Sequence, residues 1–166
     1  MRNNSLFNQY YQELVCEIFI LGHPSQGESI IFILYGDQEI IYSCVVDSFV
    51  QNNNVVPKDL LINLKVDKIT DLFWTHPHDD HSDGLLELIK EFTPRSVYIP
   101  AELQQLPEDV NNISANVLKH INAYKSYDRR YKYQPQVRGL AANMYLYNEF
   151  LSVGQYSVPF QLFAVA

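Results

Sequence analysis

Basic side chains are scarce in this chain. Lys and Arg together number 12 against 19 Asp and Glu in 166 residues, which leaves a formal net charge of −7. A protein that binds nucleic acid over a broad surface carries the opposite balance, so the sequence argues against that class. A local basic patch stays compatible with this composition.

Cysteine is equally sparse, because the chain has only Cys16 and Cys44. Their wide separation excludes the closely spaced pairs of a zinc knuckle. Each lies in an apolar, strand-like run, so we expect buried free thiols. A disulfide between neighbouring strands is the alternative.

Long hydrophobic runs are absent, and none approaches the length of a membrane span. The first dozen residues are polar and aromatic and lack the basic start and apolar core of a secretory signal. We therefore expect a cytoplasmic protein with no membrane partner. Internal repeats are also absent, and the length suits a single domain over residues 1–166.

Histidine is rare overall, yet three of the five histidines fall within six residues, His76-Pro-His78-Asp-Asp80-His81. Imidazole and carboxylate groups together hold Zn²⁺, Fe or Mn²⁺ in proteins. The cluster follows an apolar run, residues 69–74, that reads as a buried strand. α/β proteins place their chemistry on loops at such strand ends. The alternative is a chance histidine cluster on a solvated loop.

The spacing of these residues predicts how they would divide between metal ions. Alternate residues of an extended segment point the same way, so His76 and His78 can hold one ion. Pro77 stiffens the pair by fixing its own φ and favouring extended geometry at His76. Asp80 and His81 are offset enough to serve a second ion beside the first, and two such ions can clamp a hydrolytic transition state.

The segment Thr75-His-Pro-His-Asp-Asp-His81 resembles the His-x-His-x-Asp-His signature of the metallo-β-lactamase superfamily. Within that superfamily the chain is most similar to hydrolase domains of the competence-protein type, which share the His-Pro-His motif and a turn like Gly27-Glu-Ser29. The likeness covers residues 14–100 and is most specific at 75–84.

The resemblance implies an α/β fold, an αββα sandwich with a mixed sheet flanked by helices, of which this chain would be the first part. It implies a hydrolase that uses a metal-activated water, with His76, His78, Asp80 and His81 as ligands of one or two ions. Zn²⁺ is the default, and Mn²⁺ or Fe is compatible. Asp80 would also orient the attacking water. Asp47, followed here by Ser48-Phe49, would support the metal loop from behind the ligands.

Hydrophobic periodicity and turn residues place the expected elements along the chain. Asp79 is expected to face solvent, and Ser82 or Asp83 to cap the helix after the motif. Strands are expected at 14–21, 29–35, 39–46, 69–74, 96–99, 143–147 and 157–165, and helices at 58–65, 82–92 and 107–124, with a loop at 52–56.

The sequence ends inside an apolar run, residues 160–166, so we expect a domain truncated at its carboxyl end. The superfamily's site is completed by later ligands: a further His, a bridging Asp and a last His. The chain's only later histidine, His120, is expected to be a partly buried surface residue rather than a ligand, and His23 a surface residue. Catalytic zinc takes three protein ligands and structural zinc four, so we expect this chain alone to bind metal weakly and to be nearly inactive.

The stretch 125–138 mixes basic residues with tyrosines. Arg129, Arg130, Lys132 and Arg138 could steer phosphate groups towards the metals; the alternative is a solvated connector. A phosphodiester, either a small molecule or a nucleic acid, is therefore the first substrate class. Thioesters and lactams stay open, as does a non-catalytic partner-binding or regulatory module that retains the metal loop.

Overall fold

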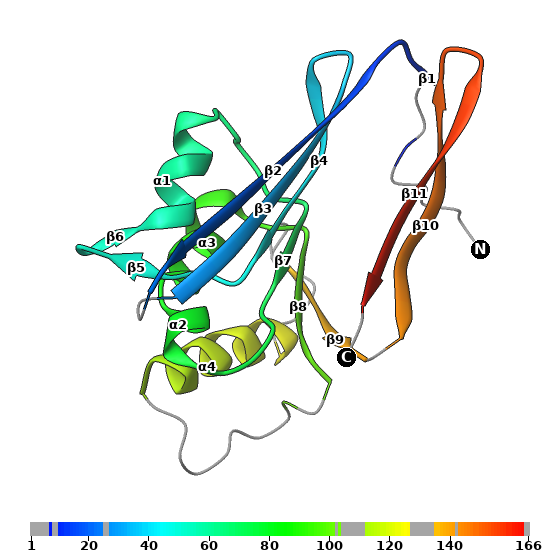
Figure 1. Cartoon of the computed structure of the whole chain (residues 1–166). Helices are drawn as coiled ribbons and strands as arrows, with labels where there is room; N and C mark the ends of the chain where they lie inside the picture. The colour runs from blue at the N-terminus through cyan, green and yellow to red at the C-terminus, as the bar shows by residue number, and fades with distance from the viewer. Residues whose placement is uncertain are drawn as a thin grey trace.

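The computed structural model describes residue 7 and residues 10–24, 27–101, 103, 112–126, 135–141 and 143–164. Its centre is a mixed six-stranded sheet with helices on one face and a smaller sheet on the other (Figure 1). The fold class expected from the sequence, layered α/β with a mixed sheet, is thus confirmed.

The large sheet has the strand order β2-β3-β4-β7-β8-β9. The first three strands form an antiparallel meander, and from β4 onward the neighbours run parallel. Parallel neighbours bring their carboxyl ends to one edge, where loops from distant parts of the sequence meet. The strand bounds are β2 Leu14–His23, β3 Gly27–Gly36, β4 Glu39–Val46, β7 Asp71–Phe73, β8 Ser96–Pro100 and β9 Gln136–Leu140.

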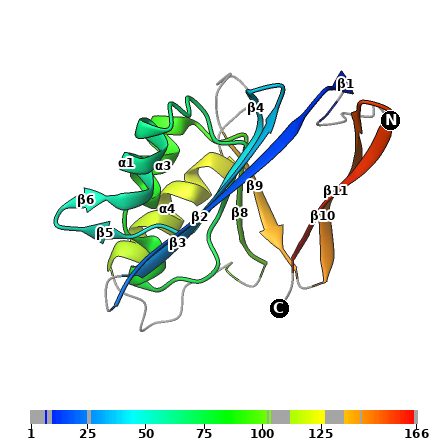
Figure 2. The same ribbon diagram turned by 45° about the horizontal axis from the view of Figure 1, so that its top comes forward.

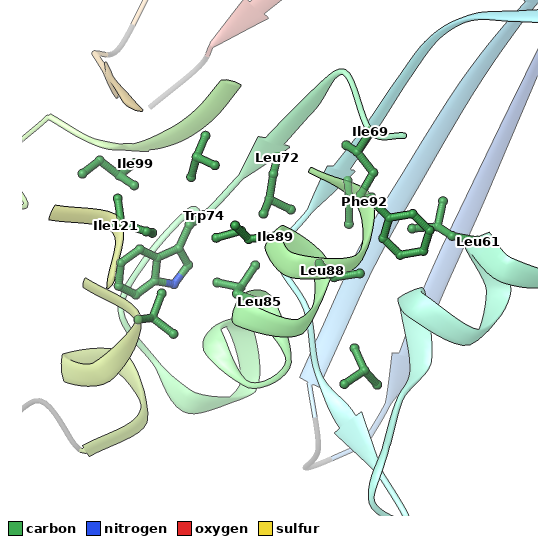
Figure 3. Close-up of a cluster of buried hydrophobic side chains, with 14 of the residues drawn as sticks. Leu61, Ile69, Leu72, Trp74, Leu85, Leu88, Ile89, Phe92, Ile99 and Ile121 are labelled. Carbon is green, nitrogen blue, oxygen red and sulfur yellow. The ribbon is translucent and has the colours of Figure 1, made fainter. Parts of the chain in front are cut away.

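Helices cover one face of this sheet, as the turned view also shows (Figure 2). They are α1 (Val56–Asn63), α2 (Asp79–Ser82), α3 (Leu85–Phe92) and α4 (Asn112–Ser126). The main core lies between these helices and the sheet, around the fully buried Trp74 (Figure 3). Leu85, Leu88, Ile89 and Phe92 supply the apolar side of α3 at the helical spacing that the sequence shows.

The second sheet, order β1-β10-β11, faces the opposite side of the large one. Its strands are β1 (Tyr10–Tyr11), β10 (Met144–Val153) and β11 (Tyr156–Ala164). A buried polar contact joins the two sheets. Asp71 Oδ2 on β7 accepts hydrogen bonds from the hydroxyls of Tyr42 on β4, at 2.9 Å, and Tyr147 on β10, at 2.8 Å. Burial raises the pKa of Asp71 above its ordinary value.

The second sheet leaves part of the large sheet uncovered. Ile18 and Ile20 on β2 are exposed, Ile20 to 80%, although they lie on the side that faces β10 and β11. Cys16, expected to be buried, shares that side and is exposed, so that prediction was wrong, whereas Cys44 on the central strand β4 is buried. Both cysteines are free thiols. None of the described helices is long and apolar enough to cross a membrane.

The other departures from the expected elements have local causes. The helix expected over 82–92 begins only at Leu85, because Asp83 is extended and Gly84 has a φ of 86°; the separate short helix α2 ends at Ser82. Neither Ser82 nor Asp83 caps α3; the residue before it is Gly84, and the Ser82 hydroxyl bonds to the His78 carbonyl instead. The loop expected at 52–56 includes the turn and second strand of a small hairpin, whose strands are β5 (Val50–Gln51) and β6 (Asn54–Val55). Strand β9 was not expected, and residues 107–111 of the expected third helix lie outside the described residues.

Candidate metal centre

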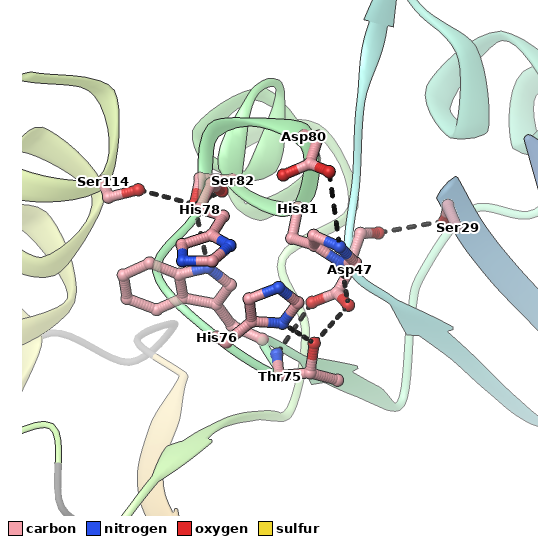
Figure 4. A network of polar contacts seen from close by, with 10 residues as sticks. Ser29, Asp47, Thr75, His76, His78, Asp80, His81, Ser82 and Ser114 are labelled. Carbon is pink, nitrogen blue, oxygen red and sulfur yellow. Dashed lines mark hydrogen bonds and ion pairs between the residues drawn. The ribbon is translucent and has the colours of Figure 1, made fainter. Parts of the chain in front are cut away.

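The candidate site forms where two neighbouring parallel strands end. Asp47 follows β4 directly, and Thr75 and His76 follow β7 after Trp74. The chain then turns through Pro77 into the short helix α2, which carries Asp80 and His81 (Figure 4). Asp47 and His81, which are 34 positions apart in the sequence, are thereby brought into contact. Such contacts are expected at the carboxyl ends of parallel strands.

Asp47 is the buried anchor of this loop. Its carboxylate Oδ1 accepts a hydrogen bond from the Thr75 N–H at 2.7 Å. Its Oδ2 lies 2.8 Å from His81 Nδ1 and also accepts the Thr75 hydroxyl. The backbone of Asp47 has a φ of 54°, and its own N–H donates to the Phe73 carbonyl at 2.8 Å. The expected contact between Asp47 and the metal loop is therefore present.

This bonding pattern fixes which ring nitrogens carry protons. Carboxylate oxygens only accept hydrogen bonds, so the contact with Asp47 requires the proton of His81 on Nδ1. The Thr75 hydroxyl donates its one hydrogen to Asp47, so it must accept a hydrogen bond from His76 Nδ1, which lies 2.9 Å away. In the neutral form of either imidazole this arrangement leaves Nε2 without a proton, and an unprotonated ring nitrogen is the atom that binds a metal.

Asp80 stands beside one of these free nitrogens. Its Oδ2 lies 3.7 Å from His81 Nε2, with the Asp80 side chain 53% exposed. Two ligands about 2.1 Å from one tetrahedral ion stand about 3.4 Å apart. The Asp80–His81 pair therefore fits a divalent cation with a small adjustment.

The remaining predicted ligands lie close by. The His76 ring centroid is 3.8 Å from that of His81 and 4.7 Å from that of His78. Candidate ligand atoms of Asp47, His76 and His81 all lie within 4.8 Å of one another. Three hydrogen bonds already occupy the Asp47 oxygens, which favours a role for Asp47 in orienting the loop. His78 and Asp80 stand outside the 4.8 Å group.

The surroundings of His76 also shift its protonation equilibrium. Burial, followed by the neighbouring His81 imidazole, lowers the pKa of His76 below its ordinary value. A lowered pKa keeps the ring neutral near neutral pH. A neutral imidazole is the form that coordinates a metal.

A second layer of contacts holds α2 in place from the core side. The Ser82 hydroxyl is fully buried, donates to the His78 carbonyl, and accepts from Trp74 Nε1 at 3.0 Å. Ser114 on α4 lies 2.8 Å from the same hydroxyl. Thr75 and Ser82 border the motif, and their hydroxyls were the available signal. No role was predicted for Thr75, and Ser82 was expected only as a helix cap. Ser114 is remote in sequence and carries no such signal.

Other residues singled out in the sequence lie as follows. Asp79 was expected to point to solvent, but it is half-buried and its Oδ1 is buried with no hydrogen-bond partner, so that prediction was wrong. His120 Nδ1 lies 2.9 Å from the Asn116 carbonyl on its own helix, and His120 is partly buried as expected. His23 is exposed at the β2–β3 turn, and Glu28 is also exposed.

The family of this chain follows from comparison with known sequences. The family model described as "Metallo-beta-lactamase superfamily" matches residues 45–144. No curated protein sequence matches the chain. A solved structure described as a new diphosphatase from the PhnP family is similar over 91% of this chain, with 14% identity and a TM-score of 0.44. The chain spans 63% of that protein's length. The family match covers more than half of the chain and includes Asp47 and the whole histidine motif, so this protein belongs to the metallo-β-lactamase superfamily.

Proposed function

We propose that this chain is the metal-binding part of a metal-dependent hydrolase, in which His76, His78, Asp80 and His81 hold one or two divalent ions. One observation carries the proposal. A single buried carboxylate, Asp47, orients His81 directly and His76 through Thr75, and so leaves their Nε2 atoms free. A chance cluster on a solvated loop would not require such support. Zn²⁺ suits this nitrogen and oxygen donor set, and Mn²⁺ or Fe is compatible.

A divalent ion held by these residues would supply an acidified water and would polarise the scissile bond. The protein's part is to orient the reactants. The Asp80 carboxylate is more than half exposed and lies beside His81 Nε2, so it can accept a hydrogen bond from an attacking water. Asp80 is therefore our candidate catalytic residue as well as a ligand.

A phosphodiester, of a small molecule or a nucleic acid, is the proposed substrate. The support is the likeness to competence-type hydrolase domains and the basic stretch 125–138. Arg138, the one basic residue of that stretch with a described side chain, donates to Gln136 and packs its guanidinium 5.9 Å from the centre of the Tyr98 ring. Phosphate steering therefore depends on Arg129, Arg130 and Lys132, which lie outside the described residues. Thioesters and lactams are the alternative substrates.

The test is metal content followed by a screen with a chromogenic phosphodiester, a thioester and a β-lactam. The chain alone is expected to bind zinc weakly, so the screen needs excess metal; tight, full occupancy would contradict that expectation. Asp80→Asn is expected to lower turnover by about 10²- to 10⁴-fold, the usual worth of a positioned acid–base group. Asp79→Asn, one residue away on the same short helix, is the matched control and is expected to keep most activity.

A non-catalytic partner-binding or regulatory module is the second candidate. It is favoured by the small donor set: among the described residues, the candidate ligand atoms that gather within 4.8 Å come from Asp47, His76 and His81. Zinc bound without turnover of any of the three substrate classes would support this candidate over the hydrolase. Absence of binding even in large metal excess would refute the metal site itself.

A further inference from the structure

The first residue of β3, Gly27, lies directly beneath the metal loop. A Cβ atom built on Gly27 would overlap the carbonyl oxygen of Asp80 and would lie 2.6 Å from the Phe49 Cβ. The backbone of Gly27 has a φ of 125°, a conformation that residues with side chains rarely adopt. Only glycine therefore fits here without displacing Asp80 or Phe49.

Two residues further along β3, Ser29 meets the other half of the site. Its hydroxyl donates to the main-chain carbonyl of Asp47 at 2.9 Å, and its side chain is fully buried (Figure 4). Residues two apart on a strand face the same side of the sheet, so Gly27 and Ser29 share one surface. One strand end thus touches the backbone of Asp80 and the backbone of Asp47.

We propose that Gly27 and Ser29 are positioning residues that set the separation between Asp80 and the Asp47–His81 pair; the inference rests on the proposed function. The Asp80 side chain is largely exposed, so few side-chain contacts fix its position. The backbone of Asp80 therefore has to maintain the 3.7 Å distance between Asp80 Oδ2 and His81 Nε2. The loop is further tied by the Ser48 N–H, which donates to the His81 carbonyl at 3.3 Å. A methyl group at position 27 would push the Asp80 carbonyl away and take its carboxylate out of reach of the shared ion.

The experiment uses Gly27→Ala in the full chain with two readouts. Zinc affinity is measured by competition with a chromophoric chelator. Amide hydrogen exchange of Ser48 and His81 is measured in metal-free protein, and it reports the loop geometry without any ion. Gly27→Ala is expected to weaken zinc binding by about 10- to 100-fold, the usual cost of losing a partner behind the ligands, and to accelerate exchange at both amides.

Two other glycines provide matched controls. Gly36 lies at the far end of the same strand, and a Cβ there would overlap the Tyr11 ring, so Gly36→Ala introduces a comparable clash away from the site. Gly154 has a φ of 54° with open space around it, so Gly154→Ala introduces backbone strain without a clash. Both controls are expected to keep zinc affinity within about twofold of the parent, far below the effect of a lost supporting contact.

The outcomes separate the inference from the proposed function. Unchanged zinc affinity and unchanged Ser48 and His81 exchange in Gly27→Ala would overturn the positioning role. If Gly27→Ala accelerates amide exchange but neither the variant nor the parent binds zinc, the positioning role is supported and the metal site is refuted. If Gly27→Ala does not fold, Ser29→Ala carries the test, because it removes a single hydroxyl. Ser29→Ala is expected to weaken zinc binding and to accelerate exchange at the Thr75 amide, which donates to Asp47. No change in either quantity would overturn the proposal.

Discussion

Replacing Asp47 by Asn tests the assignment of the site most directly. The substitution keeps the shape of the side chain, and Asn tolerates the φ of 54° at this position, so the backbone is not newly strained. The amide oxygen can still accept the Thr75 N–H, which lies 2.7 Å from Oδ1. The change is confined to Oδ2, where an acceptor of two hydrogen bonds becomes an NH₂ donor.

The expected magnitudes follow from those two bonds. Hydrogen bonds to a charged group contribute about 1.5–3 kcal/mol each, so losing both sets a ceiling of about 3–6 kcal/mol. The amide can recover one contact by donating to His81 Nδ1, which lowers the expected loss in free energy of unfolding to about 1–3 kcal/mol. That recovery moves the His81 proton to Nε2 and so blocks the ligand atom. Zinc affinity is therefore expected to fall by about 10- to 100-fold.

The assay combines denaturant unfolding, zinc competition and ¹⁵N chemical shifts of the His81 ring, which identify the protonated nitrogen. Asp37→Asn is the matched control, because Asp37 Oδ1 also accepts two backbone N–H groups, from Gln12 at 2.7 Å and Glu13 at 2.9 Å, at a turn outside the site. The reasoning is refuted if Asp47→Asn keeps the proton on Nδ1 of His81 and binds zinc as tightly as the parent.

Three further changes test the surrounding structure. Ser82→Ala leaves the buried Trp74 Nε1–H without its acceptor and is expected to cost about 1–3 kcal/mol in denaturant unfolding; an unchanged midpoint would contradict the role of that hydroxyl. Leu88→Ala empties a fully buried position and is expected to cost about 2–5 kcal/mol by the same measurement, whereas Ile62→Ala on the exposed side of α1 is expected to cost far less. Because the pKa of Asp71 is raised in the folded state, its neutral form is favoured there, and stability is lost as pH rises through that raised pKa. The melting temperature of Asp71→Asn is therefore expected to rise relative to that of the parent as the pH increases from acid to neutral. A difference that does not depend on pH would contradict the raised pKa of Asp71.

The sequence predicts the strands and the motif well because both signals are local. Strand β4 has the expected bounds, and α3 shows the apolar spacing read from Leu85 to Phe92. The metal-ligand assignment of His76, His78, Asp80 and His81 stays a prediction, as does the truncated single domain. What the sequence could not show depends on tertiary contacts. The break before α3 lies at the extended Asp83 and the left-handed Gly84, and the exposure of Cys16 follows from how far the second sheet extends.

The parts of the site differ in how far apart they lie along the chain. His76 to His81 are neighbours in any conformation, whereas Asp47 reaches His81 across 34 positions and only in the native protein. The denatured chain therefore keeps a weak ability to chelate a cation, and a ligand stabilises a protein only by its preference for the native over the denatured state. The rise in melting temperature on adding zinc would consequently measure how much better the folded loop, oriented by Asp47, binds the ion than the denatured chain does.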